Sequence, residues 1–171
     1  MATIGIFYGS TEGNTERICT KIQTALGGED AVALHNVNSA SADDMAEYDF
    51  LILASPTWDI GELQEDWDSF IDEIEDVDYD GKMVAYVGLG DKEGYPDTFM
   101  DAPGIIHERI ADSGAEFVGL WDTDEYEFEE SKAIVDGKFL GLMIDEDNEQ
   151  DKTDDRIARW VAQLKTEGFG S

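Results

Sequence analysis

Residues 3–26 read TIGIFYGSTEGNTERICTKIQTAL, and this stretch decides the fold. Its first six residues are rich in apolar and β-branched side chains, which is typical of a buried strand. A short loop of glycines and hydroxyl-bearing residues follows. Apolar residues then recur at helical spacing until Gly27 and Gly28, which end the helix. Strand, loop and helix in this order predict the first unit of a parallel sheet.

The rest of the chain repeats this alternation. Helical patterns cover roughly the residues 63–74, 99–110 and 154–165. Further strand-like segments lie at 31–37, 50–55, 83–90 and 116–121. We therefore predict an α/β fold in a single domain over residues 1–171, a doubly wound five-stranded parallel sheet of order 2-1-3-4-5 with helices on both faces.

One segment departs from the alternation. Residues 122–137 read DTDEYEFEESKAIVDG and are mostly polar and acidic. The next seven residues, KFLGLMI (138–144), resemble a strand again. We interpret residues 122–137 as an insertion that interrupts the last strand.

The charge is strongly negative, with 41 acidic and 11 basic residues in 171 and a formal net charge of −30. Nucleic acid is excluded as a partner, because phosphate backbones are bound by clustered Lys and Arg. Eleven of the acids fall in residues 59–80. They form either a docking face for a basic partner or a solvated surface, kept soluble by charge or adapted to high salt, and charge alone favours the second explanation.

Other features limit the location and the chemistry. The chain shows neither a signal peptide nor a membrane-length apolar run, so we expect a cytoplasmic protein without membrane insertion. The single Cys19 lies on the apolar face of the first helix and is expected in the core. His35 and His107 are predicted to be surface or strand-end residues, and DVDYDG (76–81) a turn rather than a calcium loop. The sequence offers no catalytic constellation and no metal site.

The loop GSTEGNT (9–15) is suited to an anion. It precedes a helix N-terminus, where backbone N–H groups and the helix dipole favour negative charge, and Ser10, Thr11 and Thr15 add hydroxyl donors. It lacks the lysine of a nucleoside-triphosphate loop. The loop is therefore either a site for a terminal monophosphate or an ordinary Ser/Thr-rich cap. Trp58 and Tyr95, in the loops after two further strands, are either loop anchors or the two walls of a slot for a flat ring.

Four segments together resemble the flavodoxin family over nearly the whole chain. They are IGIFYGSTEGNTE, PTWDIGELQEDW, GLGDKEGYPDTF and DGKFLGLMIDEDNEQDKTDDRIARWVAQL. The insertion resembles that of the long-chain type. The resemblance implies an electron-transfer protein and not an enzyme: a low-potential one-electron carrier with non-covalent FMN, which shuttles between semiquinone and hydroquinone. The competing classes are an FMN-dependent enzyme or quinone reductase on the same fold, and a relative without FMN.

The resemblance also implies a set of cofactor-binding residues. The FMN phosphate would be held by Ser10, Thr11, Glu12, Gly13, Asn14 and Thr15. The ring would lie between Trp58 and Tyr95, with Thr57, Asp59, Ile60 and Gly61 along its N5 edge. The pyrimidine edge would meet the backbone around Gly90, Asp91, Thr98 and Met100, and the ribityl chain would lie near Asp147. Glu12 and Asp59 depart from the family, which commonly has Thr or Ser at the first position and, in close relatives, Asn at the second.

The same resemblance suggests redox partners with basic docking sites. Examples are ferredoxin–NADP reductase, photosystem I and a nitrogenase-type acceptor. A monomer is expected, in the cytoplasm or, for a mature algal chain, in the plastid stroma.

Overall fold

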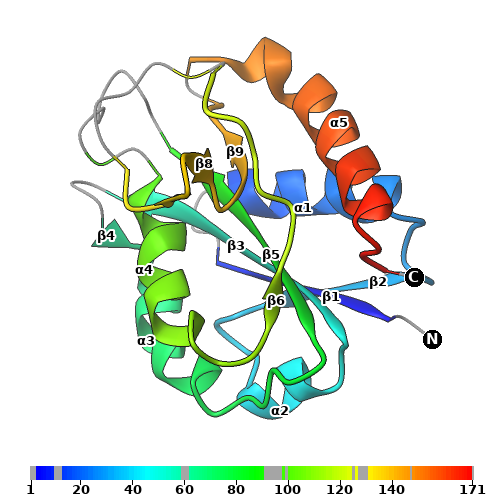
Figure 1. Ribbon diagram of the computed structural model, residues 1–171, viewed down its shortest axis with the longest axis vertical. Coiled ribbons are helices and arrows are strands. Elements are labelled where there is room, and N and C mark those ends of the chain that lie inside the picture. The colour runs from blue at the N-terminus through cyan, green and yellow to red at the C-terminus, as the bar shows by residue number, and fades with distance from the viewer. Residues whose placement is uncertain are drawn as a thin grey trace.

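A parallel sheet forms the centre of the computed structural model, which describes residues 3–9, 13–58, 62–90, 98, 100–124, 126, 131–146 and 148–170. The strands follow the order β2-β1-β3-β5 and end in an edge strand made of β6 and β9 (Figure 1). Their bounds are β1 Ile4–Tyr8, β2 Val32–Asn36, β3 Phe50–Trp58, β5 Met83–Leu89, β6 Glu116–Phe117 and β9 Gly141–Ile144. This topology is the predicted order 2-1-3-4-5, which is thereby confirmed.

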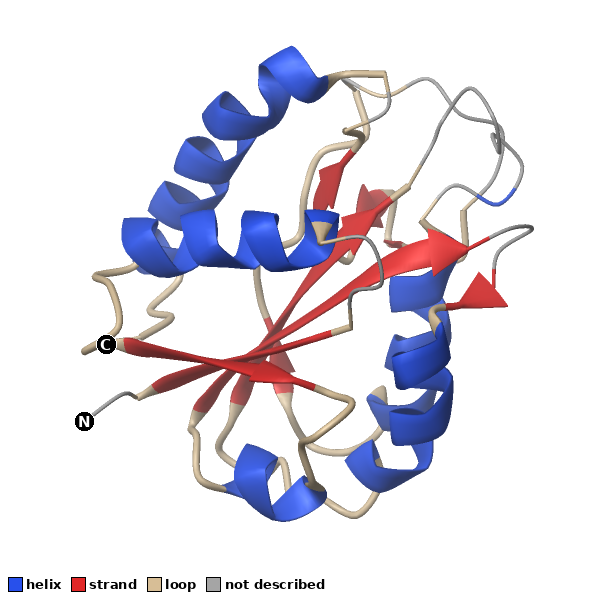
Figure 2. Ribbon diagram, turned by 180° about the vertical axis from the view of Figure 1, so that it is seen from behind, coloured by secondary structure: helices blue, strands red, loops and turns tan. Residues whose placement is uncertain are grey.

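Helices cover both faces of this sheet. Helices α1 (Asn14–Ala25) and α5 (Thr153–Thr166) lie together on one face. Helices α3 (Glu65–Ile74) and α4 (Asp101–Ile110) cover the other, with the short α2 (Ala42–Ala46) beside α3 (Figures 1 and 2). A 3₁₀ turn, η2 (Gln150–Lys152), leads into α5. None of the helices in the described part of the chain has the length and hydrophobicity of a membrane span.

The edge strand is interrupted over a longer stretch than we predicted. The N–H of Val118, just after β6, still donates to the carbonyl of Val84 on β5 (3.0 Å), and β9 begins only at Gly141, so residues 119–121 and 138–140 also leave the sheet. Gly119 has a φ angle of 79°, a conformation that favours glycine. Its carbonyl accepts a hydrogen bond from the indole N–H of Trp160 (2.8 Å), so the chain turns toward α5 at this point. Trp121 then exchanges backbone hydrogen bonds with Phe139. The insertion carries its own hairpin, β7 (Ile134–Val135) with β8 (Lys138–Phe139).

The core is built from the apolar strands and the inner faces of the helices. Phe7, Leu51, Ile52 and Val87 are fully buried in the sheet, as expected for central parallel strands. Cys19 is also fully buried, as predicted, and burial raises the pKa of its thiol, so it is an inert core residue. Residues 76–81 form the predicted turn, with Tyr79 packed inward.

The two histidines are half-buried. His35 lies near the end of strand β2, as predicted, whereas His107 lies in helix α4. His35 stacks on Phe7 at 4.6 Å between ring centroids, and its Nε2 lies 2.8 Å from the hydroxyl of Tyr48. His107 lies with Nδ1 3.1 Å from the hydroxyl of Tyr86. Alternation and spacing did not reveal these pairs, because each joins residues from separate elements.

Lowering the pH should destabilise the wild-type protein more than a His107→Gln variant, whose side chain at position 107 cannot take up a proton. Burial lowers the pKa of His107 below its usual value of 6.5, with Glu108 opposing the shift. The unfolded chain therefore takes up a proton at higher pH than the folded chain, and stability is lost as the pH falls through this window. Urea unfolding at about pH 7.5 and about pH 5.5 measures the effect. If the two proteins differed in unfolding free energy by the same amount at both pH values, the prediction would be wrong.

Candidate functional site

The predicted site residues lie at one edge of the sheet. β1, β3 and β5 run parallel, so their carboxyl ends meet at the same edge of the sheet. The chain places β2 on one side of β1 and β3 on the other, so the order in which strands are added to the sheet reverses beside β1. Ligands of doubly wound sheets bind at this switch point. Gly9 follows β1, Thr57 and Trp58 end β3, and Gly90 follows β5. The structure thus brings together three segments that the sequence assigned to one site.

The first of these segments enters the N-terminus of α1. Gly13 is the N-cap residue and has φ 89, a left-handed conformation that favours glycine. No side chain of the described residues caps this helix, and the N–H groups at a helix N-terminus favour an anion. Thr15 is 2% exposed, and its hydroxyl has no partner among the described residues. This end of α1 has the donors that a monophosphate needs. Ser10, Thr11 and Glu12 lie outside the described residues.

A cation that the sequence analysis did not consider lies beside this helix end. Arg17 donates to the side chain of Asn14 (2.8 Å) and to the carboxylate of Glu146 (2.6 Å). Glu146 also accepts a hydrogen bond from Thr153 at 3.0 Å. The spacing of Asn14 and Arg17, three residues apart on a helix, was the available signal. Glu146 compensates the charge of Arg17 and brings the segment next to Asp147 close to α1, whereas Asp147 itself lies outside the described residues.

Gln64 supports the start of the same loop from the side of α3. Its side chain is 1% exposed and packs directly on Gly9, where an added Cβ would overlap the amide oxygen. That oxygen accepts the backbone N–H of Trp67 at 3.3 Å and caps α3. The close approach explains why position 9 is glycine. Local patterns give no hint of this contact, because 55 residues separate the two positions.

The second segment is the end of β3. The hydroxyl of Thr57 accepts the backbone N–H of Ala102 at 3.0 Å, which ties this strand end to the first turn of α4. The backbones of Thr57 and Trp58 pair in antiparallel register with Leu63 and Glu62 of β4 (Glu62–Leu63). This short hairpin fixes where the turn between them begins and ends. Asp59, Ile60 and Gly61 of that turn lie outside the described residues.

The third segment begins at Gly90 and returns at Met100. The N–H of Gly90 donates to the carbonyl of Ile144 (3.2 Å). Met100 has φ 59, precedes α4 as its N-cap residue and is fully buried, with its sulfur only 3.0 Å from where a Cβ on Gly90 would lie. The two ends of the loop therefore pack against each other. Thr98 is half-buried, while Asp91 and Tyr95 lie outside the described residues.

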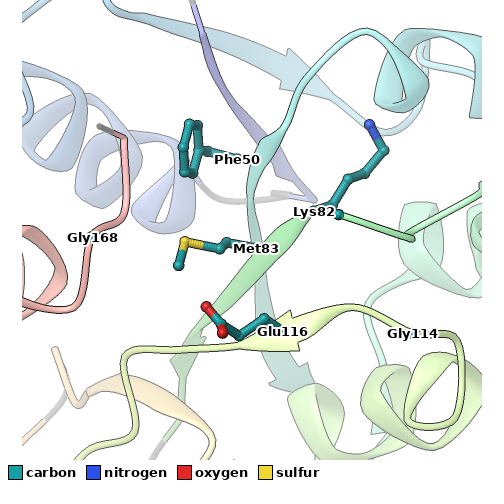
Figure 3. Close-up of a pocket in the computed structure, with 7 residues that line it drawn as sticks. Phe50, Lys82, Met83, Gly114, Glu116 and Gly168 are labelled. Carbon is teal, nitrogen blue, oxygen red and sulfur yellow. The ribbon is translucent and has the colours of Figure 1, made fainter.

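A separate hollow lies at the opposite edge of the sheet. It measures about 350 Å³ and is lined by Phe50, Met83, Glu116 and nearby glycines. Lys82 points away from Phe50 and Met83 (Figure 3), and its ammonium group donates to the carbonyls of Ala46 and Tyr48. This hollow is at the amino ends of β3 and β5, where ligands of this sheet type do not bind.

The sheet order and the helices on both of its faces define a doubly wound α/β protein. The family model for flavodoxin matches residues 6–160, so the chain belongs to the flavodoxin family. It is 52% identical to a flavodoxin of Nostoc sp. strain PCC 7120, covering 98% of this chain and 97% of the relative. It is 45% identical to flavodoxin 2 of Escherichia coli, covering 96% and 95%.

Solved structures agree with this assignment. A flavodoxin of Fusobacterium nucleatum, solved bound to flavin mononucleotide, superposes with a TM-score of 0.90 at 33% identity, covering 98% of this chain and 99% of that one. Flavodoxins are electron-transfer proteins, so the chain is an electron carrier rather than an enzyme, and redox partner proteins are implied. The family resemblance and the fold are confirmed, and the length agrees with the long-chain type.

Proposed function

We propose that this protein binds one FMN non-covalently at the carboxyl edge of its sheet and carries single electrons at low potential between other proteins. The observation that carries the proposal is the N-terminus of α1, with Gly13 and Thr15, at the switch point of a flavodoxin-family chain. The relative from Fusobacterium nucleatum, similar over nearly its whole length, binds the same cofactor.

The proposed roles follow the three segments of the site. Residues 10–15 hold the phosphate with hydroxyl and backbone donors. Trp58 and Tyr95 enclose the ring, and residues 57 and 59–61 lie along its N5 edge. The pyrimidine edge meets the backbone at Gly90, Asp91, Thr98 and Met100, and Asp147 lies near the ribityl chain. When bound, FMN supplies the one-electron chemistry.

The charges of the chain favour a low potential. An electron added to the site raises its negative charge, and the surrounding acids oppose this. The one cation beside the described part of the phosphate end, Arg17, is neutralised by Glu146 at 2.6 Å. The neutral donors thus hold the phosphate without adding a positive charge that would make the flavin easier to reduce.

The partners proposed here are redox proteins with basic docking sites, such as a ferredoxin–NADP reductase, photosystem I or a nitrogenase-type acceptor. The exposed acids of α3, including Glu65 and Asp68, would steer them to the carboxyl edge. We propose a monomeric protein that works in the cytoplasm.

Reconstitution tests the proposal. Apoprotein mixed with FMN should quench the flavin fluorescence at one equivalent per chain and keep the flavin through gel filtration. Stepwise reduction should then proceed in two separated one-electron stages, both at low potential. A protein that releases FMN on the column would contradict cofactor binding. Oxidation of NAD(P)H in air by the pure holoprotein would instead indicate an enzyme.

A further inference from the structure

The far end of the insertion is attached to the first turn of α4. The backbone N–H of Lys132 donates to the carboxyl group of Asp101 at 2.7 Å. Asp101 is the first residue of α4 and is only 3% exposed, whereas Lys132 is exposed, so this hydrogen bond is half-buried. A hydrogen bond to a charged carboxylate is among the more stabilising kinds.

The contact continues one turn further along the helix. The backbone of Lys132 packs so closely on Gly104 that an added Cβ would overlap its carbonyl group. Glycine in a helix is otherwise unfavourable relative to alanine. Glycine at position 104 therefore leaves the space in which the backbone of Lys132, from the insertion, packs against the start of α4.

The near end of the insertion is attached to the other face of the sheet. The hydroxyl of Tyr126 donates to the carbonyl of Met143 on β9 and accepts the indole N–H of Trp121 (2.8 Å). The guanidinium of Arg156, on α5, lies 4.3 Å from the centre of the Tyr126 ring. Because α5 and α4 cover opposite faces of the sheet (Figure 1), the contacts of Tyr126 and Lys132 attach the insertion to both helix layers.

The same turn of α4 reaches the proposed cofactor site. Next to Asp101, the N–H of Ala102 donates to Thr57 at the end of β3 (3.0 Å). On the other side, Met100 closes the loop that starts at Gly90. Any shift of this turn is passed to both loops that would line the flavin.

We infer that the insertion braces the flavin-binding loops through Asp101, which is a positioning residue for the cofactor. This inference rests on the proposed function. Loss of the Asp101–Lys132 hydrogen bond loosens the first turn of α4 and, with it, Thr57 and Met100, which this turn holds in place. FMN then escapes faster, although neither Asp101 nor Lys132 belongs to the proposed set of contacts.

Three variants separate anchoring from charge. Asp101→Ala removes the acceptor, Asp101→Asn removes a charge but keeps an oxygen that accepts the Lys132 N–H, and Gly104→Ala displaces Lys132 without changing charge. Asp101→Ala and Gly104→Ala should release FMN about three- to tenfold faster than wild type, the equivalent of one such hydrogen bond. Asp101→Asn should stay close to wild type. Asp112→Ala, in the exposed turn after α4, is the matched control and should have no effect.

Amide hydrogen exchange of the apoproteins gives a readout that does not depend on flavin. The Lys132 amide should exchange faster in Asp101→Ala and Gly104→Ala but keep its protection in Asp101→Asn. Similar effects of Asp101→Asn and Asp101→Ala would overturn the inference in favour of charge. Unchanged FMN release in Gly104→Ala, whose helix propensity is improved, would also overturn it. Failure of the wild-type protein to retain FMN would instead contradict the proposed function itself.

Discussion

Riboflavin should bind this protein at least about a hundredfold more weakly than FMN, because it lacks the phosphate. The N-terminus of α1 offers the N–H groups of its first turn, the positive end of the helix dipole and the Thr15 hydroxyl. Hydrogen bonds to a charged group contribute about 1.5–3 kcal/mol each, so two of them already give this factor. Dissociation constants from flavin fluorescence quenching measure the ratio.

A pair of isosteric variants locates the effect. Thr15→Val removes a buried hydroxyl at the phosphate end and should weaken FMN binding about tenfold, with little change for riboflavin. Thr20→Val is the matched control, since its hydroxyl donates only to the carbonyl of Glu16 among the described residues and lies on the exposed face of α1. Equal affinity of the wild-type protein for the two flavins would show that the loop binds no phosphate.

The architecture could be predicted because local patterns determine it. Each central strand is a nearly continuous apolar run and each long helix has one apolar face, so their order along the chain gives the sheet type. The short elements were missed because a local pattern needs several residues to become visible. Helix α2 has five residues and β4 has two, too few to show a period. The split of the edge strand depends on Gly119 turning toward Trp160, a contact with a residue 41 positions away.

The sequence could place candidate site residues only where they belong to one loop. The order of strand, loop and helix puts Gly13 and Thr15 at a helix N-terminus, and the structure has them there. The salt bridge from Arg17 to Glu146 spans 129 positions and the hydrogen bond from Lys132 to Asp101 spans 31, and neither leaves a periodic signal. Such contacts arise from packing between elements, so the support of the site had to come from the structure.

The surface acids are distributed over all described parts of the molecule rather than on one face. Exposed carboxylates occur on α3, at the start of α5 and in the loop before β2, which holds Glu29 and Asp30. Of the cations, Arg17, Lys21, Arg109 and Arg159 each pair with an acid at 3.0 Å or less. The remaining excess of negative charge repels itself and destabilises the folded state at low salt.

Raising the salt concentration should therefore stabilise the apoprotein while it slows electron transfer to a basic partner. The screening length falls from about 10 Å at 0.1 M salt to about 3 Å at 1 M, which weakens both the self-repulsion and the steering. We expect the melting temperature to rise by roughly 10 °C and the transfer rate to a ferredoxin–NADP reductase to fall about tenfold. Thermal unfolding and stopped-flow reduction of the partner measure the two quantities on the same samples.

Two matched double variants separate stability from docking. Glu65→Gln with Asp68→Asn neutralises exposed acids in the first turn of α3, at the carboxyl edge of the sheet, and Glu29→Gln with Asp30→Asn does so at the opposite edge. Both should raise the melting temperature at low salt by similar amounts, because self-repulsion depends on total charge. Only the α3 pair should slow electron transfer, since steering depends on where the charge lies relative to the site. Equal transfer rates for the two variants would assign the acidic surface to salt adaptation alone.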